Sequence, residues 1–564
     1  MNRAYERMIH YYLDYARQHK DDWQALERAP FDQIRRAWNV VGENTLSIKP
    51  DERARMLIGY LNVLNEYFEK RGLWDEYRTW IEYGIEATRI LEDNALLGGL
   101  LNDLGLCYRQ SGQPVIAKKY FEQALEIRQQ FGPKAGEAVT LNNLGLVHDD
   151  LGERRQAVSF YEQALQVHRQ VGHKCGEVLA LHNLATTYEA LGEWESARQT
   201  YEKALQIAHE TGDRISEAGT LSNLGHLLLQ MNRFDDAEKI LNEALTLMRQ
   251  IGDRSHEPAV LNNQGLLAIA RRQSRQAIAL FEQALELQRA IGQTDTEAPI
   301  LNNLGSSYQT LGEWQKALGY FQQALVRHRA TANRAGEAMA LANIGGIHYE
   351  RQNWIEAISA YEQALAILRT TEDRDSQATL LNNLAAIYHA QGAWAKSLEY
   401  LTEALSIHHS VGNQHMEATA LNNIASIYYE TDDFAKAREY FETALTLRQA
   451  SGDMAEAGSI LNNLGALSSA QGNTESALAY YQQALALRKE IEDYLGQAHT
   501  LYNLALLSLN LGKQEQAEQF AHEAIALDQR LDLPQLSRDL GLLEEIQQKR
   551  QTSFIETDRR FETK

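Results

Sequence analysis

The amino-acid sequence predicts an all-α solenoid of stacked helix pairs, because one motif recurs along it in strict register. The motif is a five-residue string that reads LNDLG at Leu101 and returns in variants such as LNNLG, LHNLA and LANIG. Eleven copies follow one another at a spacing of 40 residues, from Leu101 to Leu501, without insertion or deletion. Leu61 lies on the same grid and adds a degenerate twelfth copy. A fixed period of this length is typical of solenoids, which grow lengthwise without enlarging a single core.

Each copy contains the signals of two amphipathic helices and a turn. Leu101, Leu104 and Tyr108 are spaced three and four residues apart, which places them on one face of a first helix. Phe121 lies between alanines that recur in register and builds the same kind of face on a second helix. Gly112, or a glycine at its position in most other copies, marks a tight turn between the two. One such pair cannot bury its apolar face, so we expect neighbouring pairs to stack on each other.

This order of large and small residues resembles the tetratricopeptide repeat (TPR), whose usual period is 34 residues rather than 40. With its LNNLG and GDRxxE strings, the longer version is similar to the repeats of kinesin light chains and Pins-type adaptors. It also resembles the sensor arrays of bacterial STAND signal-transduction ATPases of the AfsR and MalT type. The resemblance implies a right-handed superhelix of about 11–12 helix-turn-helix repeats with capping helices at both ends. We place the array at residues 61–540, with a degenerate repeat at 61–100 and regular repeats from 101.

The two ends of the chain depart from the consensus. Residues 1–60 have a helical pattern and are predicted to be either an N-terminal cap or the junction to an ATPase module of a larger protein. Pro534 interrupts the last repeat, and a closing helix is expected from Leu536 to Ile546. Residues 541–564 are predicted to hold the end of this helix and a disordered tail.

Composition and charge restrict the possible functions. The formal net charge of −21 disfavours nucleic acid and anionic membranes as partners and favours neutral to basic polypeptides. Only two cysteines are present, and the N-terminus lacks an apolar leader, so we predict a cytoplasmic protein. The sequence has no phosphate-binding loop, no complete H-E-x-x-H motif and no C-x-x-C pair. We therefore expect no enzymatic activity, no cofactor and no metal.

Asparagine recurs at a position that packing does not explain. It stands two residues after the anchor leucine in ten of eleven copies, and the preceding residue is often asparagine as well. In the TPR fold that the sequence resembles, this part of the first helix lines the concave surface. Because an amide both donates and accepts hydrogen bonds, it can hold the main chain of an extended peptide. The alternative is that these amides bond the neighbouring repeat, and both roles can coexist. The predicted peptide-binding residues are Asn102, Asn142, Asn143, Asn183, Asn223, Asn262, Asn263, Asn302, Asn303, Asn343, Asn382, Asn383, Asn422, Asn423, Asn462, Asn463 and Asn503.

Variable positions five and eight residues after the anchor are expected to set specificity. Arg109 is the only basic residue among them, so a clamp for a C-terminal carboxylate is absent. We predict a polar to acidic groove that binds an extended, neutral to basic polypeptide. The candidate specificity residues are Arg109, Asp149, Glu189, Tyr349, His389 and Tyr429.

Two functions remain open at this point. The first is a protein-interaction scaffold that holds a peptide in the groove. The second is the ligand-sensing C-terminal module of a STAND ATPase, separated from its NTPase module.

Overall fold

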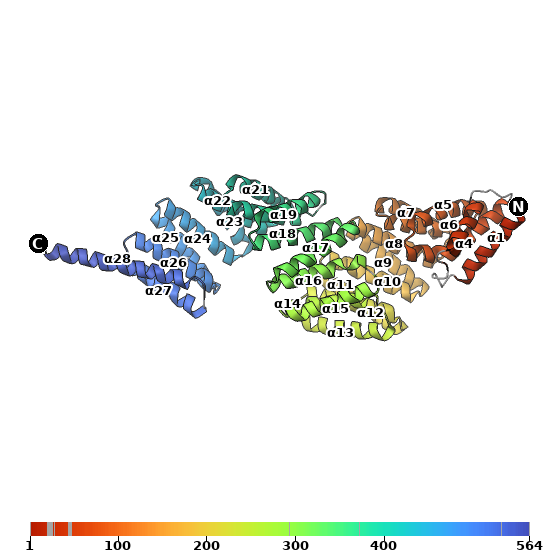
Figure 1. Cartoon of the computed structure of the whole chain (residues 1–564), viewed down its shortest axis with the longest axis horizontal. Coiled ribbons are helices and arrows are strands. Elements are labelled where there is room, and N and C mark those ends of the chain that lie inside the picture. Colours follow the sequence, from red (N-terminus) through yellow and green to blue (C-terminus); the bar gives the residue numbers. More distant parts are fainter. Residues whose placement is uncertain are drawn as a thin grey trace. The chain divides into compact units, whose positions relative to one another are not determined.

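The structure is a computed structural model that describes residues 2–19, 26, 29–42, 48–292, 294–371, 373–531 and 533–562. It divides into two compact units, Met1–Thr294 and Asp295–Lys564. Within the described ranges, all regular structure is helical (Figure 1). The helices form twelve consecutive pairs, which confirms the predicted all-α solenoid and its number of repeats.

In each unit, a first helix packs on the second helix of its own pair and on the second helix of the preceding pair. The first helices are α4 (Pro50–Arg71), α6 (Asn94–Gln110), α8 (Lys134–Asp150), α10 (Lys174–Ala190), α12 (Arg214–Gln230), α14 (Glu257–Ala270), α16 (Ala298–Thr310), α18 (Arg334–Glu350), α20 (Arg374–Ala390), α22 (Gln414–Glu430), α24 (Met454–Ala470) and α26 (Tyr494–Asn510). The second helices are α5 (Trp74–Leu91), α7 (Pro114–Phe131), α9 (Arg154–Val171), α11 (Trp194–Thr211), α13 (Phe234–Ile251), α15 (Ser274–Ala290), α17 (Trp314–Ala330), α19 (Trp354–Leu368), α21 (Trp394–Val411), α23 (Phe434–Ser451), α25 (Thr474–Glu490) and α27 (Gln514–Leu531). A short 3-10 helix, η1 (Thr294–Thr296), precedes α16.

The turn within each pair uses a left-handed residue. Gly112 has a φ of 71°, a conformation that glycine adopts without steric cost. Copies that lack glycine here still make the turn, as Asn232 does with a φ of 57°. The turn geometry is therefore a property of the repeat rather than of glycine alone.

Small residues at fixed positions let the two helices of a pair approach closely. At Gly105 of α6, an added Cβ would lie 2.6 Å from the ring of Phe121 on α7. Phe121, Ala117 and Ala124 are fully buried in this contact. The recurring glycine or alanine four residues after the anchor is thus explained by packing.

In several repeats, an ion pair joins a pair of helices to the preceding pair. A glutamate near the start of a first helix is buried and meets a basic residue at the end of the preceding second helix. Arg249 Nε lies 2.7 Å from Glu257 Oε1, and Arg329 Nε lies 2.8 Å from Glu337 Oε1. These carboxylates also complement the positive end of the helix dipole.

Additional helices cover both ends of the array. At the start of the chain, α1 (Asn2–Gln18) and α3 (Ala29–Gly42) pack on α4. The ring of Trp38 stacks on that of Trp80 at 4.0 Å, and the Tyr60 hydroxyl donates to the Ile9 carbonyl at 2.6 Å. These contacts bury the apolar face that the first pair would otherwise expose.

At the far end, α28 (Leu536–Glu562) packs on α27 through Leu542 and Ile546. It starts at the expected residue but continues through most of the segment for which we expected a disordered tail. After Gly541 this segment contains no glycine or proline that would end a helix. None of the helices in the described ranges is long and apolar enough to cross a membrane.

Candidate functional site

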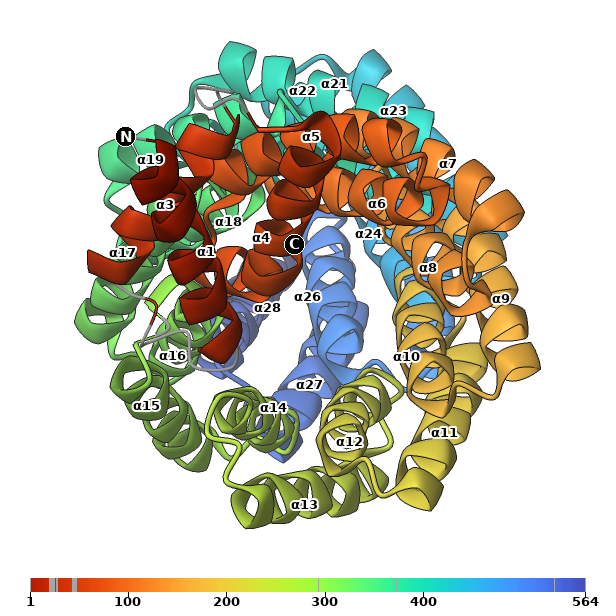
Figure 2. The same cartoon turned by 90° about the vertical axis from the view of Figure 1, so that its right-hand side faces the viewer.

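The asparagine positions lie in the middle of the first helices. In the first unit, α8, α10 and α12 line the inner side of the curve and α9, α11 and α13 the outer side (Figure 2). In the second unit, α16 and α18 likewise lie inside α17 and α19. We call the surface formed by the residues one, two, five and eight positions after each anchor leucine the first-helix face.

Many of the predicted amides are bound within the chain. In the first unit, Asn143 Nδ2 donates to Asn102 Oδ1 at 3.0 Å, and Asn183 Nδ2 donates to Asn142 Oδ1 at 3.0 Å. Each bond joins residues 41 positions apart, so it links one repeat to the next. The second asparagine of a repeat thus donates to the first asparagine of the repeat before it. These bonds favour the structural alternative for this part of the array.

Two further repeats have another residue in place of the first asparagine, and there the second asparagine of the next repeat bonds a different acceptor. Asn223 lies 3.0 Å from His182 Nε2, and Asn263 donates to the Ser222 carbonyl at 3.4 Å. Asn262 and Asn303 also interact with other residues.

At the end of the array, the asparagine pairs are again complete. Asn463 donates to Asn422 and Asn503 donates to Asn462, each at 3.1 Å. The hydrogen bonds between asparagines of successive repeats are therefore found near both ends of the array, but they are missing from part of the second unit.

The interruption comprises three consecutive repeats. Asn343, Asn383 and Asn423 lie on α18, α20 and α22, and none of their side chains hydrogen-bonds to another described residue. Asn343 and Asn383 are half-buried and Asn423 is exposed. Three successive repeats thus present amides whose hydrogen-bonding groups are not used within the described chain.

Local sequence explains why these three amides are left over. For Asn383, the preceding repeat has Ala342 at the acceptor position, and alanine offers no side-chain acceptor. For Asn343 and Asn423, the acceptor asparagines are present but turn to histidines of second helices. Asn302 Nδ2 lies 3.3 Å from His328 Nε2, and Asn382 Nδ2 lies 3.4 Å from His408 Nε2.

Both histidines are suited to accept these bonds. Burial lowers the pKa of His328 and of His408, so each imidazole is uncharged at neutral pH. An uncharged imidazole has one acceptor nitrogen, and the amide NH₂ group can only donate to it. The carbonyl oxygens of Asn302 and Asn382 then remain buried without a partner among the described residues.

Three of the predicted specificity residues are used within the first unit. Arg109 Nε lies 2.6 Å from Asp150 Oδ2 of the next repeat. Asp149 accepts from the Thr187 hydroxyl at 2.7 Å, and burial raises its pKa. Glu189 lies 3.1 Å from His226 Nδ1. These side chains join neighbouring repeats instead of projecting freely.

The other three predicted specificity residues lie in the three repeats that have unpaired amides. Tyr349 packs edge-on against Trp354 at 5.6 Å, and His389 packs edge-on against Trp394 at 5.0 Å. Tyr429 packs against Phe434 of the same repeat, with ring centroids 6.1 Å apart. His389 Nε2 also lies 3.3 Å from Glu430 Oε2. Each of these three repeats therefore has an aromatic pair near the end of its first helix.

Small residues leave space on this part of the face. Gly346, Ala386 and Ser426 occupy the position five residues after the anchor in these three repeats. Some other repeats hold a leucine at this position, as at Leu106, Leu146 and Leu266, although Ser306 and Ala466 are small as well. We call Asn343, Asn383 and Asn423, with their flanking residues at these positions, the open amide segment.

Comparison with known proteins agrees with the repeat architecture. The family model described as "Tetratricopeptide repeat" matches residues 96–170, 176–250, 216–290, 296–370, 376–450 and 456–530. Comparison with curated proteins finds no match.

Several solved structures match parts of this chain. BtubC (BKLC) from P. vanneervenii is 24% identical with a TM-score of 0.36 and covers 39% of this chain and 92% of its own. The apo form of RapI is 13% identical with a TM-score of 0.40 and covers 49% of this chain and 99% of its own. The apo form of the quorum sensor NprR from B. thuringiensis is 16% identical with a TM-score of 0.44 and covers 64% of this chain and 99% of its own.

Proposed function

Because the chain belongs to the tetratricopeptide repeat family, we propose that it is a protein-interaction scaffold that holds an extended polypeptide on its first-helix face. We place the contact at the open amide segment, with Asn343, Asn383 and Asn423 holding the main chain of the ligand. The other asparagines predicted from the sequence interact within the chain: most of them join neighbouring repeats, whereas Asn302 and Asn382 bond a histidine of their own repeat.

The unpaired amides of three successive repeats carry this proposal. A carboxamide can donate to a main-chain carbonyl and accept from a main-chain N–H, so it binds a peptide unit regardless of its side chain. Amides that already bond within the chain, such as that of Asn143, are poorer candidates. The three available amides follow one another without a gap, as an extended ligand requires.

The spacing of the repeats sets the length of the ligand. Packed helices lie about 8–10 Å apart, and an extended chain rises about 3.3 Å per residue. One amide would therefore meet the peptide about every third residue. Three contacts need a ligand of roughly seven to nine residues.

The surroundings of the amides indicate the character of the ligand. Met339, four residues before Asn343 on α18, is 49% exposed and offers an apolar contact on the same helix face. Glu350 and Glu430 are exposed acidic residues at the ends of α18 and α22. We infer a neutral to basic peptide with an apolar anchor.

The proposal is tested by selecting nine-residue peptides from a random display library with the full chain, and then measuring their affinity for two variants. Asn343→Ala/Asn383→Ala/Asn423→Ala should weaken binding roughly 100-fold, because each amide contributes about 1 kcal/mol or more. Its thermal stability should stay unchanged, because these side chains have no partners to lose.

The matched control is Asn143→Ala/Asn183→Ala, which removes amides of the same type that are bonded within the chain. It should lower stability and leave the peptide affinity unchanged. If the triple variant binds the selected peptides as tightly as the parent chain, the open amide segment is not the binding site.

A further inference from the structure

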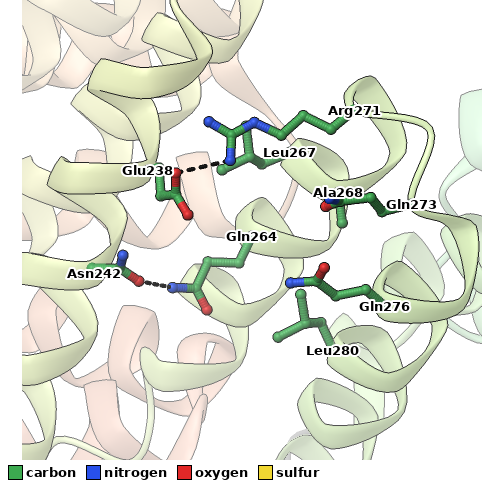
Figure 3. Close-up of a pocket in the computed structure, with 9 residues that line it drawn as sticks. All are labelled: Glu238, Asn242, Gln264, Leu267, Ala268, Arg271, Gln273, Gln276 and Leu280. Atoms are coloured by element: carbon green, nitrogen blue, oxygen red, sulfur yellow. Dashed lines mark hydrogen bonds and ion pairs between the residues drawn. The ribbon is translucent and has the colours of Figure 1, made fainter.

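A second candidate site lies in the first unit, away from the open amide segment. A cavity of about 280 Å³ lies between α13, α14 and α15. Gln264, Gln276 and Leu280 are among the residues that line it (Figure 3). Ala268 and Asn242 also line the cavity.

The cavity occupies a place that an aromatic ring fills in other repeats. Seven and nineteen residues after the anchor, two rings stack in five repeats; for example, the centroids of Tyr108 and Tyr120 are 5.2 Å apart, and those of Tyr308 and Tyr320 are 5.5 Å apart. The other three stacks are His148–Phe160, Tyr388–Tyr400 and Tyr428–Tyr440. The equivalent residues at the cavity are Ala268 and Leu280.

A third position completes this comparison. In three repeats, a lysine fifteen residues after the anchor lies over the tyrosine ring, as Lys316 does over Tyr308 at 4.9 Å. The equivalent residue at the cavity is Gln276. A ring placed in the cavity would therefore have Gln276 on one face and Leu280 on the other.

The edge of this space is polar because of an unusual core residue. The residue three positions after the anchor is leucine or isoleucine in the other ten copies, and all ten are buried: Leu104, Leu144, Leu184, Leu224, Leu304, Ile344, Leu384, Ile424, Leu464 and Leu504. Here it is Gln264, which is half-buried and donates to Asn242 Oδ1 at 2.9 Å. A polar residue at a core position goes against packing, and such departures occur at functional sites.

The equivalent groove two repeats earlier provides a reference. It is lined by Glu162, Leu184 and Tyr188, in the places of Asn242, Gln264 and Ala268. The aromatic ring and the apolar core residue are thus retained there. The amide-lined cavity is therefore not a general consequence of the repeat geometry.

The hydrogen-bonding groups that remain available define the ligand. In the wall, Arg271 and Glu238 form an ion pair at 2.8 Å and neutralise each other. The cavity therefore does not need a charged ligand. Gln264 Oε1, Asn242 Nδ2 and the amide of Gln276 have no hydrogen-bond partner among the described residues. The cavity thus combines apolar surface with unused donors and acceptors.

We propose that this cavity binds a planar, uncharged ring that carries hydrogen-bonding groups on its edge. The ring would take the place of the missing aromatic side chain, stack on Leu280, and bond Gln264 and Asn242. It could come from a tyrosine side chain of a polypeptide or from a free heterocycle, since both offer the same chemistry.

The test measures binding of three probes to the full chain by saturation-transfer NMR: N-acetyltyrosinamide, uracil and toluene. Binding of the first indicates a side chain as the source of the ring, and binding of uracil indicates a free heterocycle. A dissociation constant on the order of 1 mM or tighter is expected for at least one of these two. Toluene lacks polar groups and should bind at least 10-fold more weakly than the better of them.

Two variants locate the binding. Ala268→Tyr/Leu280→Tyr restores the stacked pair of other repeats and should abolish binding. Gln264→Leu introduces the residue that eight of the other ten copies have, and it should weaken binding of the polar probes at least 10-fold, with thermal stability unchanged or raised. Both variants follow the pattern of the other repeats, so they are expected to fold, and thermal unfolding checks this.

A matched control creates a similar space without the amides. Tyr308→Ala/Tyr320→Leu removes a stacked pair beside Leu304, and should not gain binding of uracil or N-acetyltyrosinamide. The proposal is overturned if neither polar probe binds the parent chain, if binding survives in Ala268→Tyr/Leu280→Tyr, or if toluene binds as well as the polar probes.

Discussion

Asn143 and Asn383 occupy the same position in their repeats, yet only one of them is bonded within the described chain. Asn143 donates to Asn102, whereas the residue that corresponds to Asn102 in front of Asn383 is Ala342. For Asn383, the residue 41 positions earlier thus decides that the amide stays available instead of joining two repeats. The same side chain can therefore serve cohesion in one repeat and recognition in another.

This difference predicts opposite responses to the same substitution. Asn143→Ala should lower the free energy of unfolding by about 1–2 kcal/mol, because it removes a buried hydrogen bond and leaves part of the bonding capacity of Asn102 unused. Asn383→Ala should change it by less than about 0.5 kcal/mol. Urea unfolding followed by circular dichroism checks both values. Equal losses in the two variants would contradict the distinction.

The two cysteines are predicted to differ in reactivity. Burial raises the pKa of the Cys107 thiol to about 12, whereas Cys175 is exposed. At pH 8, only about one Cys107 side chain in ten thousand would be the reactive thiolate. Ellman's reagent should therefore modify one thiol per native chain and two in denaturant. Rapid modification of both thiols in the native chain would show that Cys107 is accessible.

The positions of the candidate residues were predictable from the sequence, but their partners were not. The periodicity places every asparagine on the first-helix face. Which amides remain unpaired depends on His328 and His408, which come from second helices and approach through the fold. Ala342 was the visible sign for Asn383, because among the residues that replace the first asparagine (His182, Ser222, Ala342 and Tyr502) it alone has no side-chain acceptor.

At the scale of single helices, the apolar pattern and the turn residues predicted most of the architecture. The pattern located the anchor leucines, but these lie in the middle of the first helices; α4 begins at Pro50, before Leu61. Most first helices start with polar residues, which do not follow the apolar periodicity. The periodicity therefore predicts the register of the repeats better than it predicts where each helix begins. The same limit applies to α28, whose polar second half carries no strong pattern.

The contact between α27 and α28 is predicted to depend on pH. Asp528 on α27 and Asp539 on α28 are 0% and 1% exposed, and neither carboxylate oxygen of Asp528 has a described hydrogen-bond partner. Burial and the nearby Asp539 raise the pKa of Asp528 to about 6, although Arg538, 2.8 Å from Asp539, opposes this. The folded state therefore holds a proton that the unfolded chain releases near pH 4.

A group whose pKa is raised on folding makes the folded state less stable as the pH rises between the two values. The α27–α28 contact should thus be strongest at about pH 4 and weaken as the pH rises through about 6. Hydrogen exchange of α28, corrected for the intrinsic rate, measures this. Asp528→Asn should remove the pH dependence, and Glu544→Gln, on the exposed side of α28, should keep it. An unchanged profile in Asp528→Asn would exclude this carboxyl as the cause.

At the scale of the whole molecule, the fold and the function differ in how much the sequence determines them. Twelve pairs in one register leave little freedom for the architecture, because a pair must bury its apolar face on a neighbouring pair of its unit. The repeat itself does not select a ligand. In both proposed sites, selection of a ligand depends on the few residues that depart from the repeat, such as Ala342 and Gln264.

The net charge of −21 predicts how a ligand should approach the chain. A basic peptide is attracted from a distance, and this attraction is screened as the Debye length falls from about 10 Å at 0.1 M salt to about 3 Å at 1 M. Its association rate should therefore fall at least 10-fold between 0.02 M and 0.5 M salt, because electrostatic steering acts mainly on association. A neutral peptide of the same length, which forms the same main-chain bonds with the open amide segment, should change less than twofold. Stopped-flow measurement with a selected nine-residue peptide and its lysine-to-glutamine analogue compares the two. Equal salt dependence of the two peptides would mean that the electrostatic field of the chain does not affect association. The asparagine variants would still test the amide contacts separately.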